Sequence, residues 1–111
     1  MRILILGAGK MGSFFNDVLS FDHETAVYET DPKKLRFVYN TYRFTDLEEI
    51  RAFKPELVIN AATVKYTIEA FQHIIPVIPK ECILSDIASI KNGLKDFYKE
   101  CGFPFVSTHP M

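Results

Sequence analysis

The segment from Ile3 to Gly12 restricts the possible folds of this chain more than any other stretch. Four consecutive aliphatic residues, 3–6, predict a buried strand, and glycines at positions 7, 9 and 12 follow with the spacing Gly-x-Gly-x-x-Gly before an amphipathic helix. In this context the first glycine makes a tight turn, the second lets the backbone approach a pyrophosphate, and the third lets the helix lie close to the sheet. The free N–H groups of the helix N-terminus favour phosphate. The segment predicts a dinucleotide-binding turn whose cofactor contacts are Gly7, Gly9, Lys10, Met11 and Gly12.

Length and composition predict one compact domain. The 111 residues are 48% hydrophobic and 14% aromatic, which argues against disorder. The formal net charge is −1 without a basic block, so we expect no nucleic acid and no membrane surface as partner. No apolar run approaches the ~20 residues of a membrane span. Cys82 and Cys101 lack metal-ligand or Cys-x-x-Cys spacing, so we expect no metal and two reduced thiols in a cytoplasmic protein.

Strand and helix patterns alternate along the chain, which predicts a parallel sheet with helices on both faces. Strands are expected at 3–6, 25–29, 42–44, 56–60, 82–86 and 105–107. Helices are expected at 11–19, 32–38, from 45 to about 53, at 64–73 and at 89–101. Six strands in this sequence suit a doubly wound α/β sheet of spatial order 3-2-1-4-5-6, the Rossmann dinucleotide-binding architecture, which binds its ligand at the carboxyl ends of the strands.

Three helix predictions rest on particular residues. Apolar side chains at 11, 14, 15, 18 and 19 fall on one stripe of the first helix, as expected for its buried face. Asp31 before Pro32 is typical of an N-cap followed by proline at the first helical position. Thr45 and Glu48 have the spacing of a capping box.

A carboxylate at the end of the second strand, ~20 residues past the glycines, is expected to bind the adenosine ribose hydroxyls. Glu29 stands 22 residues after Gly7 and is preferred to Asp31, which already serves as a helix cap. A glutamate in this position repels the 2′-phosphate of NADP, so the predicted cofactor is NAD. Lys33 and Lys34 keep NADP open as an alternative.

Small side chains follow the fourth strand in the run Asn60-Ala61-Ala62-Thr63. Ala61, Ala62 and Thr63 would let a cofactor pass closely over the edge of the sheet. The same residues would also suit a tightly packed loop, and the sequence leaves both interpretations open.

Two motifs in the last quarter of the chain are more specific than the glycines: SDIASIK at 85–91 and VSTHPM at 106–111. Together with the glycine turn, they make the whole chain resemble the nucleotide-binding domain of the prephenate and arogenate dehydrogenases of tyrosine biosynthesis. Related β-hydroxyacid-type dehydrogenases share the glycines but usually lack this tail.

The resemblance implies that His109 lies near the nicotinamide and takes the proton of the substrate's ring hydroxyl, while Ser89 hydrogen-bonds in the same region. Asp86 and Lys91 match the motif around Ser89 and suit either a functional or a structural part. An imidazole titrating near pH 6.5 is a suitable base for this step. The implied reaction is the oxidative decarboxylation of prephenate to 4-hydroxyphenylpyruvate. The sequence pattern alone would also suit a helix N-cap at Ser89 and a loop position for His109. His23 and His73 are expected at the surface.

The chain departs from the family in two places. The family's proline after the fourth strand is replaced by Ala-Ala-Thr, and the family continues beyond His-Pro-Met into a helical domain that forms the homodimer and binds the substrate's carboxylates. We therefore expect 1–111 to be a single dinucleotide-binding domain, inactive alone, with an exposed apolar patch near His109. The alternatives are another β-hydroxyacid- or imine-type dehydrogenase domain, or a regulatory nucleotide-sensing module that needs Glu29 but not Ser89 or His109.

Overall fold

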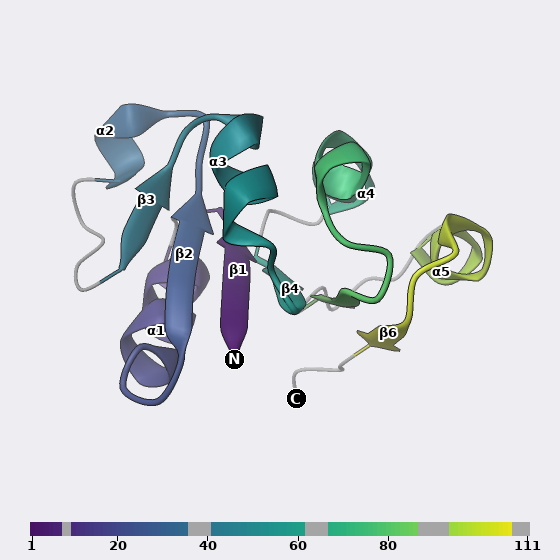
Figure 1. The fold of residues 1–111 in the computed structure, drawn as a ribbon, viewed down its shortest axis with the longest axis horizontal. Coiled ribbons are helices and arrows are strands. Elements are labelled where there is room, and N and C mark those ends of the chain that lie inside the picture. Colours follow the sequence, from purple (N-terminus) through teal and green to yellow (C-terminus); the bar gives the residue numbers. More distant parts are fainter. Residues whose placement is uncertain (8–9, 36–40, 62–66, 87–93, 108–111) are drawn as a thin grey trace.

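Six parallel strands form a single sheet in the order β3-β2-β1-β4-β5-β6, which confirms the predicted order (Figure 1). The structure, a computed structural model, describes residues 1–7, 10–35, 41–61, 67–86 and 94–107. The strands are β1 (Arg2–Leu6), β2 (Glu24–Tyr28), β3 (Tyr42–Phe44), β4 (Leu57–Asn60), β5 (Ile83–Asp86) and β6 (Phe105–Ser107).

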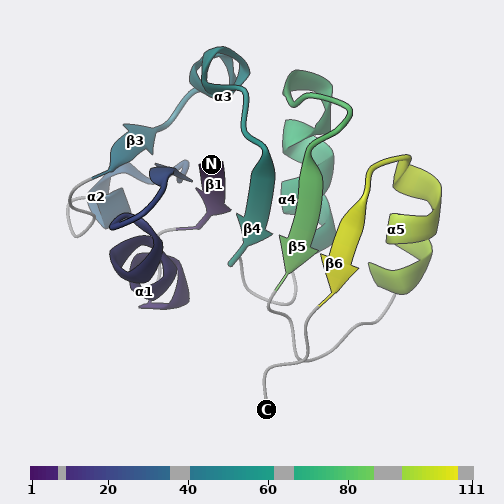
Figure 2. The same cartoon turned by 60° about the horizontal axis from the view of Figure 1, so that its bottom comes forward.

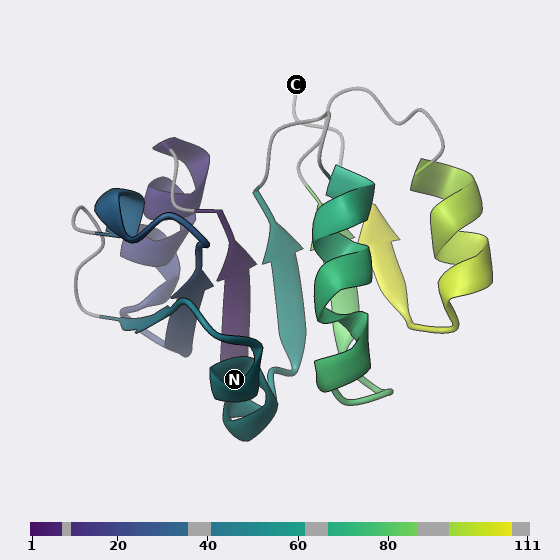
Figure 3. The same ribbon diagram turned by 90° about the horizontal axis from the view of Figure 1, so that it is seen from above.

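Helices cover both faces of the sheet, as expected for a doubly wound fold (Figure 3). The helices α1 (Lys10–Leu19) and α2 (Pro32–Leu35) belong to one face. The other face carries α3 (Leu47–Phe53), α4 (Thr67–Ile74) with the short 3₁₀ helix η2 (Ile75–Val77), and α5 (Leu94–Cys101). None of the described helices is long and apolar enough to cross a membrane.

The central strand β1 shows why four aliphatic residues occur in succession. Leu4 and Leu6 pack into the core beneath α3, α4 and α5, whereas Ile3 and Ile5 pack on the opposite side with residues of α1 and α2. All four side chains are at most 2% exposed. A parallel strand buried on both faces needs apolar residues at every position rather than at alternate ones.

The buried face of α1 differs from the predicted apolar stripe. Phe14 and Val18 are 56% and 53% exposed, so the prediction that they belong to one buried stripe is wrong. The described residues that α1 turns inward are Gly12 and Asn16, which are buried, and Leu19, which is half-buried. The side chains of residues 11 and 15 lie outside the described part of the chain. At Gly12 the helix lies too close to the end of β1 for any side chain.

A buried polar contact fixes α1 against the sheet. The Thr25 hydroxyl donates to Asn16 Oδ1 at 2.9 Å, and both residues are at most 3% exposed. The Thr41 hydroxyl in turn contacts the hydroxyl and the carbonyl oxygen of Thr25. These bonds join α1, β2 and the residue before β3, and they explain how an asparagine is tolerated in the core.

The capping box of α3 lies one residue later than predicted. Asp46, not Thr45, is the N-cap: its Oδ1 accepts the Glu48 N–H at 3.0 Å, while Glu49 Oε1 accepts the Asp46 N–H at 3.1 Å. The run Thr-Asp-Leu-Glu-Glu contains two overlapping capping patterns, and the structure uses the second.

The remaining predicted boundaries differ from the structure by small shifts. The N-cap at Asp31 is confirmed, because its Oδ1 accepts the Lys33 N–H at 3.0 Å and α2 begins at Pro32. The strand β2 ends at Tyr28, which leaves Glu29 just beyond it. The strands β4 and β5 each begin one residue later than predicted. The predicted residues 36–38, 64–66 and 89–93 lie outside the described part.

Candidate dinucleotide-binding site

The carboxyl ends of the strands meet at one edge of the sheet, the carboxyl edge (Figure 2). The last residues of neighbouring strands are paired in register across this edge, in the order Tyr28, Leu6, Asn60, Asp86 and Ser107. Three predicted cofactor residues come directly after strand ends: Gly7 after β1, Glu29 after β2 and Ala61 after β4. The topology therefore brings together residues that are far apart in the sequence.

Gly7 makes the turn that leaves β1. Its φ of 95° lies in the left-handed region, which residues other than glycine adopt only at a cost in free energy. The Gly7 N–H donates to the Tyr28 carbonyl at 3.0 Å, and the Ala61 N–H donates to the Leu6 carbonyl at 2.9 Å. The ends of β2, β1 and β4 are thus held together by backbone hydrogen bonds, with no large side chain at the turn itself.

Gly12 allows α1 to lie against the end of β1. A Cβ atom on Gly12 would lie 2.0 Å from the Gly7 carbonyl oxygen and 3.6 Å from Cγ2 of Ile5, so even alanine has no room. The first turn of α1, which contains Lys10 and Met11, follows Gly7 by three residues and is held beside the carboxyl edge. This arrangement fits a dinucleotide, because a pyrophosphate needs a close backbone and the free N–H groups of a helix N-terminus.

Glu29 is the carboxylate nearest the end of β2. It is half-buried, its N–H donates to the Phe44 carbonyl at 3.0 Å, and its Oε2 accepts the Asp31 N–H at 3.2 Å. The carboxylate of Asp31 instead caps α2, where it accepts the Lys33 N–H. Glu29 is therefore oriented by the turn that follows β2, which suits a carboxylate that is to hold hydroxyl groups.

Two buried polar side chains, Asn60 and Asp86, end β4 and β5 side by side. Asn60 Nδ2 donates to the Thr67 carbonyl at the start of α4 at 2.8 Å, and Asp86 Oδ2 accepts the Tyr98 hydroxyl at 2.6 Å. Burial, together with the hydrogen bond to Asp86, raises the pKa of Tyr98 well above its usual value. Each contact anchors a strand end to the helix that packs on it.

Tyr98 also contacts β6. Its ring stacks on that of Phe105, with 4.5 Å between the ring centroids and 4° between their planes. Tyr98 therefore ties α5 to the end of β5 and to the start of β6 at once. The role of Tyr98 could not be predicted from the sequence, because a tyrosine at a helical core position gives no local signal of the carboxylate that it contacts.

Several predicted site residues lie outside the described part of the chain: Gly9, Ala62, Thr63, Ser89 and His109. Ser89 follows the end of β5 by three residues, and His109 follows the end of β6 by two. The strands β5 and β6 are neighbours in the sheet. The side chains of Lys10 and Met11 are likewise not described.

The other two histidines differ from each other. His73 is exposed, as predicted, with Nε2 3.1 Å from the Tyr28 hydroxyl. Burial, followed by the charges of Asp46 and Glu29, raises the pKa of Tyr28. His23 is half-buried rather than at the surface, and its Nδ1 is buried without a hydrogen-bond partner in the described part of the molecule. Among the described residues, no group of three or more His, Cys, Asp or Glu side chains could hold a metal ion.

The sheet order, the positive φ at Gly7 and the close approach at Gly12 define a doubly wound domain of the Rossmann type. A comparison with models of protein families finds no match, and a comparison with curated proteins finds none either.

Solved structures share the fold. Prephenate dehydrogenase from Aquifex aeolicus, in complex with hydroxyphenyl propionate and NAD⁺, superposes with a TM-score of 0.84 at 23% identity over 100% of this chain and 42% of that one. Arogenate dehydrogenase from Synechocystis gives 0.81 at 19% identity over 99% and 41%. The 3-hydroxyisobutyrate dehydrogenase of Mycobacterium tuberculosis gives 0.81 at 14% over 97% and 40%. The chain spans about two fifths of the length of these structures.

Proposed function

We propose that this chain is the nicotinamide-cofactor-binding domain of a prephenate dehydrogenase-like oxidoreductase. The single observation that carries cofactor binding is the glycine turn: Gly12 has no space for a side chain against the Gly7 carbonyl, and Gly7 itself turns in the left-handed region. The fold shared with solved prephenate and arogenate dehydrogenases supports it. So do the SDIASIK and VSTHPM motifs, which begin within the neighbouring strands β5 and β6.

NAD is the proposed cofactor, with NADP as the alternative. Gly7, Gly9, Lys10, Met11 and Gly12 would hold the pyrophosphate, and Glu29 would accept hydrogen bonds from the adenosine ribose. Ala61, Ala62 and Thr63 would leave room for the cofactor to cross the edge of the sheet. The carboxylate of Glu29 would repel a 2′-phosphate, which favours NAD.

The bound nicotinamide would supply a hydride acceptor. The protein's own part in the reaction is proton removal and positioning. His109 would take the proton of the substrate's ring hydroxyl, and Ser89 would hydrogen-bond in the same region. With prephenate, loss of CO₂ and aromatisation accompany hydride loss, so little beyond orientation and a base is needed.

Residues 1–111 would form one dinucleotide-binding domain. In the proposed enzyme a helical domain outside this chain would bind the substrate's two carboxylates and form a homodimer, and the site of action would be the cytoplasm. Binding two carboxylates takes cationic groups in fixed positions. We therefore expect this chain to bind NAD and to show no turnover of prephenate or arogenate by itself.

Calorimetric titration with NAD and NADP tests the cofactor, and an NAD-reduction assay with prephenate tests the domain organisation. We expect saturable heat with NAD, weaker binding of NADP and no NADH formation. Absence of heat with both cofactors would contradict the proposed function. Turnover near ~10 s⁻¹, a median enzyme rate, would contradict the claim that the substrate's binding groups lie in another domain.

A second candidate is a dehydrogenase of the same architecture that acts on a β-hydroxy acid. It is favoured by the likeness to the 3-hydroxyisobutyrate dehydrogenase fold. The two candidates separate by substrate binding in the presence of NAD. In a protein in which this chain is joined to the proposed helical domain, prephenate would protect His109 from modification by diethyl pyrocarbonate in the first case, and 3-hydroxyisobutyrate would do so in the second.

A further inference from the structure

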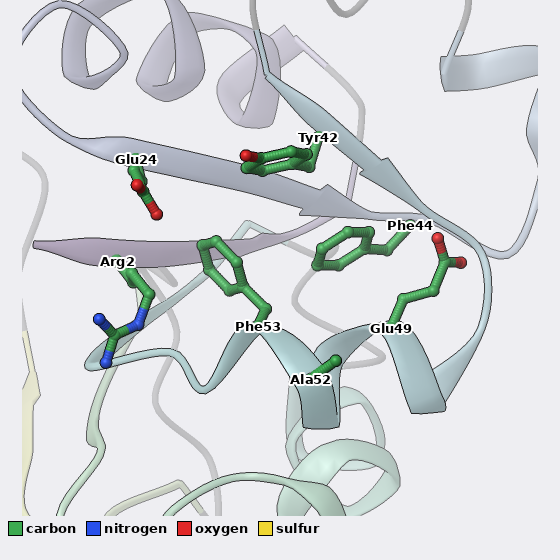
Figure 4. Close-up of a pocket in the computed structure, with 7 residues that line it drawn as sticks. All are labelled: Arg2, Glu24, Tyr42, Phe44, Glu49, Ala52 and Phe53. Carbon is green, nitrogen blue, oxygen red and sulfur yellow. The ribbon is translucent and has the colours of Figure 1, made fainter.

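A groove of about 470 Å³ begins at the amino ends of β1, β2 and β3 and extends along β3 and α3 to Phe44 and Glu49 (Figure 4). Three of its lining residues, Arg2, Glu24 and Tyr42, are the first residues of β1, β2 and β3. Phe53, the last residue of α3, lines it from the helix side. We call this surface the amino-edge groove. Nothing in the proposed function uses it, because a nicotinamide dinucleotide binds at the carboxyl ends of the strands.

Aromatic rings make up much of the groove's surface. Tyr42 and Phe44 lie near parallel, with ring centroids 6.1 Å apart, and Phe53 meets them edge-on at 6.0 and 5.6 Å. Phe44 is 8% exposed, whereas Tyr42 is 56% exposed, so more than half of its surface is open to solvent. The face of an aromatic ring carries partial negative charge and attracts organic cations.

The formal charges around the groove leave one carboxylate without a partner. The Arg2 guanidinium turns away from Glu24, donates from Nε to the Lys54 carbonyl at 2.8 Å and lies 3.7 Å from Glu56. Glu49 Oε1 is occupied by the N–H groups of Thr45 and Asp46. Within the described residues, the Glu24 carboxylate has no hydrogen bond or ion pair, although Glu24 stands next to Arg2 in register.

We propose that the amino-edge groove binds a guanidinium group, which stacks on the ring of Tyr42 and donates hydrogen bonds to the Glu24 carboxylate. A guanidinium is flat, weakly hydrated and able to donate two parallel hydrogen bonds to one carboxylate, so a ring face next to an unpaired carboxylate suits it better than a compact ammonium. Its source is a free guanidine compound or the arginine side chain of a peptide, and both carry the same guanidinium group.

The test is an NMR titration of the ¹⁵N-labelled chain with methylguanidinium at constant ionic strength. We expect saturable amide shifts at Glu24, Tyr42 and Phe53, with a Kd in roughly the millimolar range, and none at Gly12 or Glu29. Methylammonium should bind at least threefold more weakly. The tripeptide Gly-Arg-Gly distinguishes the sources: tighter binding than methylguanidinium points to a peptide, and equal binding to a small molecule.

Three variants decide the outcome. Glu24→Gln, nearly isosteric, and Tyr42→Leu should each weaken methylguanidinium binding about threefold to tenfold. Glu69→Gln is the matched control, because Glu69 is an exposed carboxylate in the first turn of α4 and lies outside the groove. Equal effects of Glu24→Gln and Glu69→Gln, or shifts scattered over all surface carboxylates, would overturn the proposal. Binding of NAD is a separate measurement, so failure here leaves the proposed function standing.

Discussion

The two edges of the sheet present different kinds of surface. At the carboxyl edge, backbone atoms dominate: Gly7 and Ala61 follow the ends of β1 and β4, and Gly12 brings α1 close. At the amino edge, the strands begin with long side chains, Arg2 and Glu24 among them. A phosphate-binding turn needs bare backbone, and a groove for a small cation needs rings and carboxylates. One parallel sheet thus presents close-packed backbone where its strands end and long side chains where its strands begin.

The two edges should respond differently to mutation. Substitution of Gly12, which packs on β1, or of Tyr98, which bonds Asp86 at the end of β5, should reduce the free energy of unfolding. Substitution of the exposed Glu24 or Tyr42 at the amino edge should act on binding alone.

Gly12→Ala is expected to have the largest effect. The added methyl group would overlap the Gly7 carbonyl oxygen at 2.0 Å, so the helix must move away from β1. We expect a loss of about 3 kcal/mol in urea unfolding. The control is Gly102→Ala, where φ is +78° but no atom lies within 4 Å, and where about 1 kcal/mol is expected. Equal losses in the two variants would contradict the close packing.

Tyr98→Phe should come next. It removes the hydroxyl that donates to the buried Asp86 carboxylate at 2.6 Å and keeps the ring stacked on Phe105. The expected loss is about 2 kcal/mol, because the hydrogen bond is buried and its acceptor is a carboxyl group. Tyr42→Phe at the amino edge removes an exposed hydroxyl and should change stability by less than about 0.5 kcal/mol. Similar losses from both substitutions would remove the contrast between the edges.

Alkaline pH should destabilise the fold through Cys82, the residue before β5. Burial, helped by the charges of Glu81 and Glu56, raises the pKa of the Cys82 thiol from 9.0 to about 12. The unfolded chain therefore loses this proton first, so the stabilisation is complete below pH 9 and is lost as the pH rises towards 12. We expect a fall of about 1.4 kcal/mol between pH 8 and pH 10 in urea unfolding. Cys82→Ala should flatten this decline, and an unchanged slope would be evidence against a buried thiol.

Glu29→Gln should act on cofactor binding with little change in stability. A neutral amide weakens the hydrogen bonds proposed with the ribose hydroxyls and removes the repulsion of a 2′-phosphate. We expect NAD to bind about tenfold more weakly and the preference for NAD over NADP to shrink. Calorimetry measures both affinities. If Glu29→Gln leaves both unchanged while Gly12→Ala does not, Glu29 is not the ribose carboxylate.

The sequence predicted the sheet order because the order follows from few local signals. Alternating strands and helices, with a glycine turn after the first strand, leave one common topology. The same turn indicated Gly7 and Gly12, whose roles depend on residues five apart in the chain. The position of Glu29 just after the second strand could be predicted because the distance from the glycine turn to the end of that strand is nearly fixed.

Features that depend on distant contacts could not be predicted. The predicted buried stripe on α1 was wrong because apolar periodicity does not reveal how closely a helix approaches its sheet. Gly12 sets that approach, and the burial of Asn16 depends on its hydrogen bond with Thr25. The cap at Asp46 was missed by one residue because the sequence supports two registers. The amino-edge groove joins Glu24 to Tyr42, which lie 18 positions apart, and no motif connects them.

The most direct test of the central claim is an amide-resolved NMR titration of the intact chain with NAD. We expect saturable shifts at Gly7, Gly12, Glu29 and Ala61, all at the carboxyl edge, and no shift at Glu24 or Tyr42 at the amino edge. Shifts centred on the amino edge, or no shift at any residue with NAD or NADP, would contradict the claim that this fold binds a nicotinamide dinucleotide at the carboxyl ends of its strands.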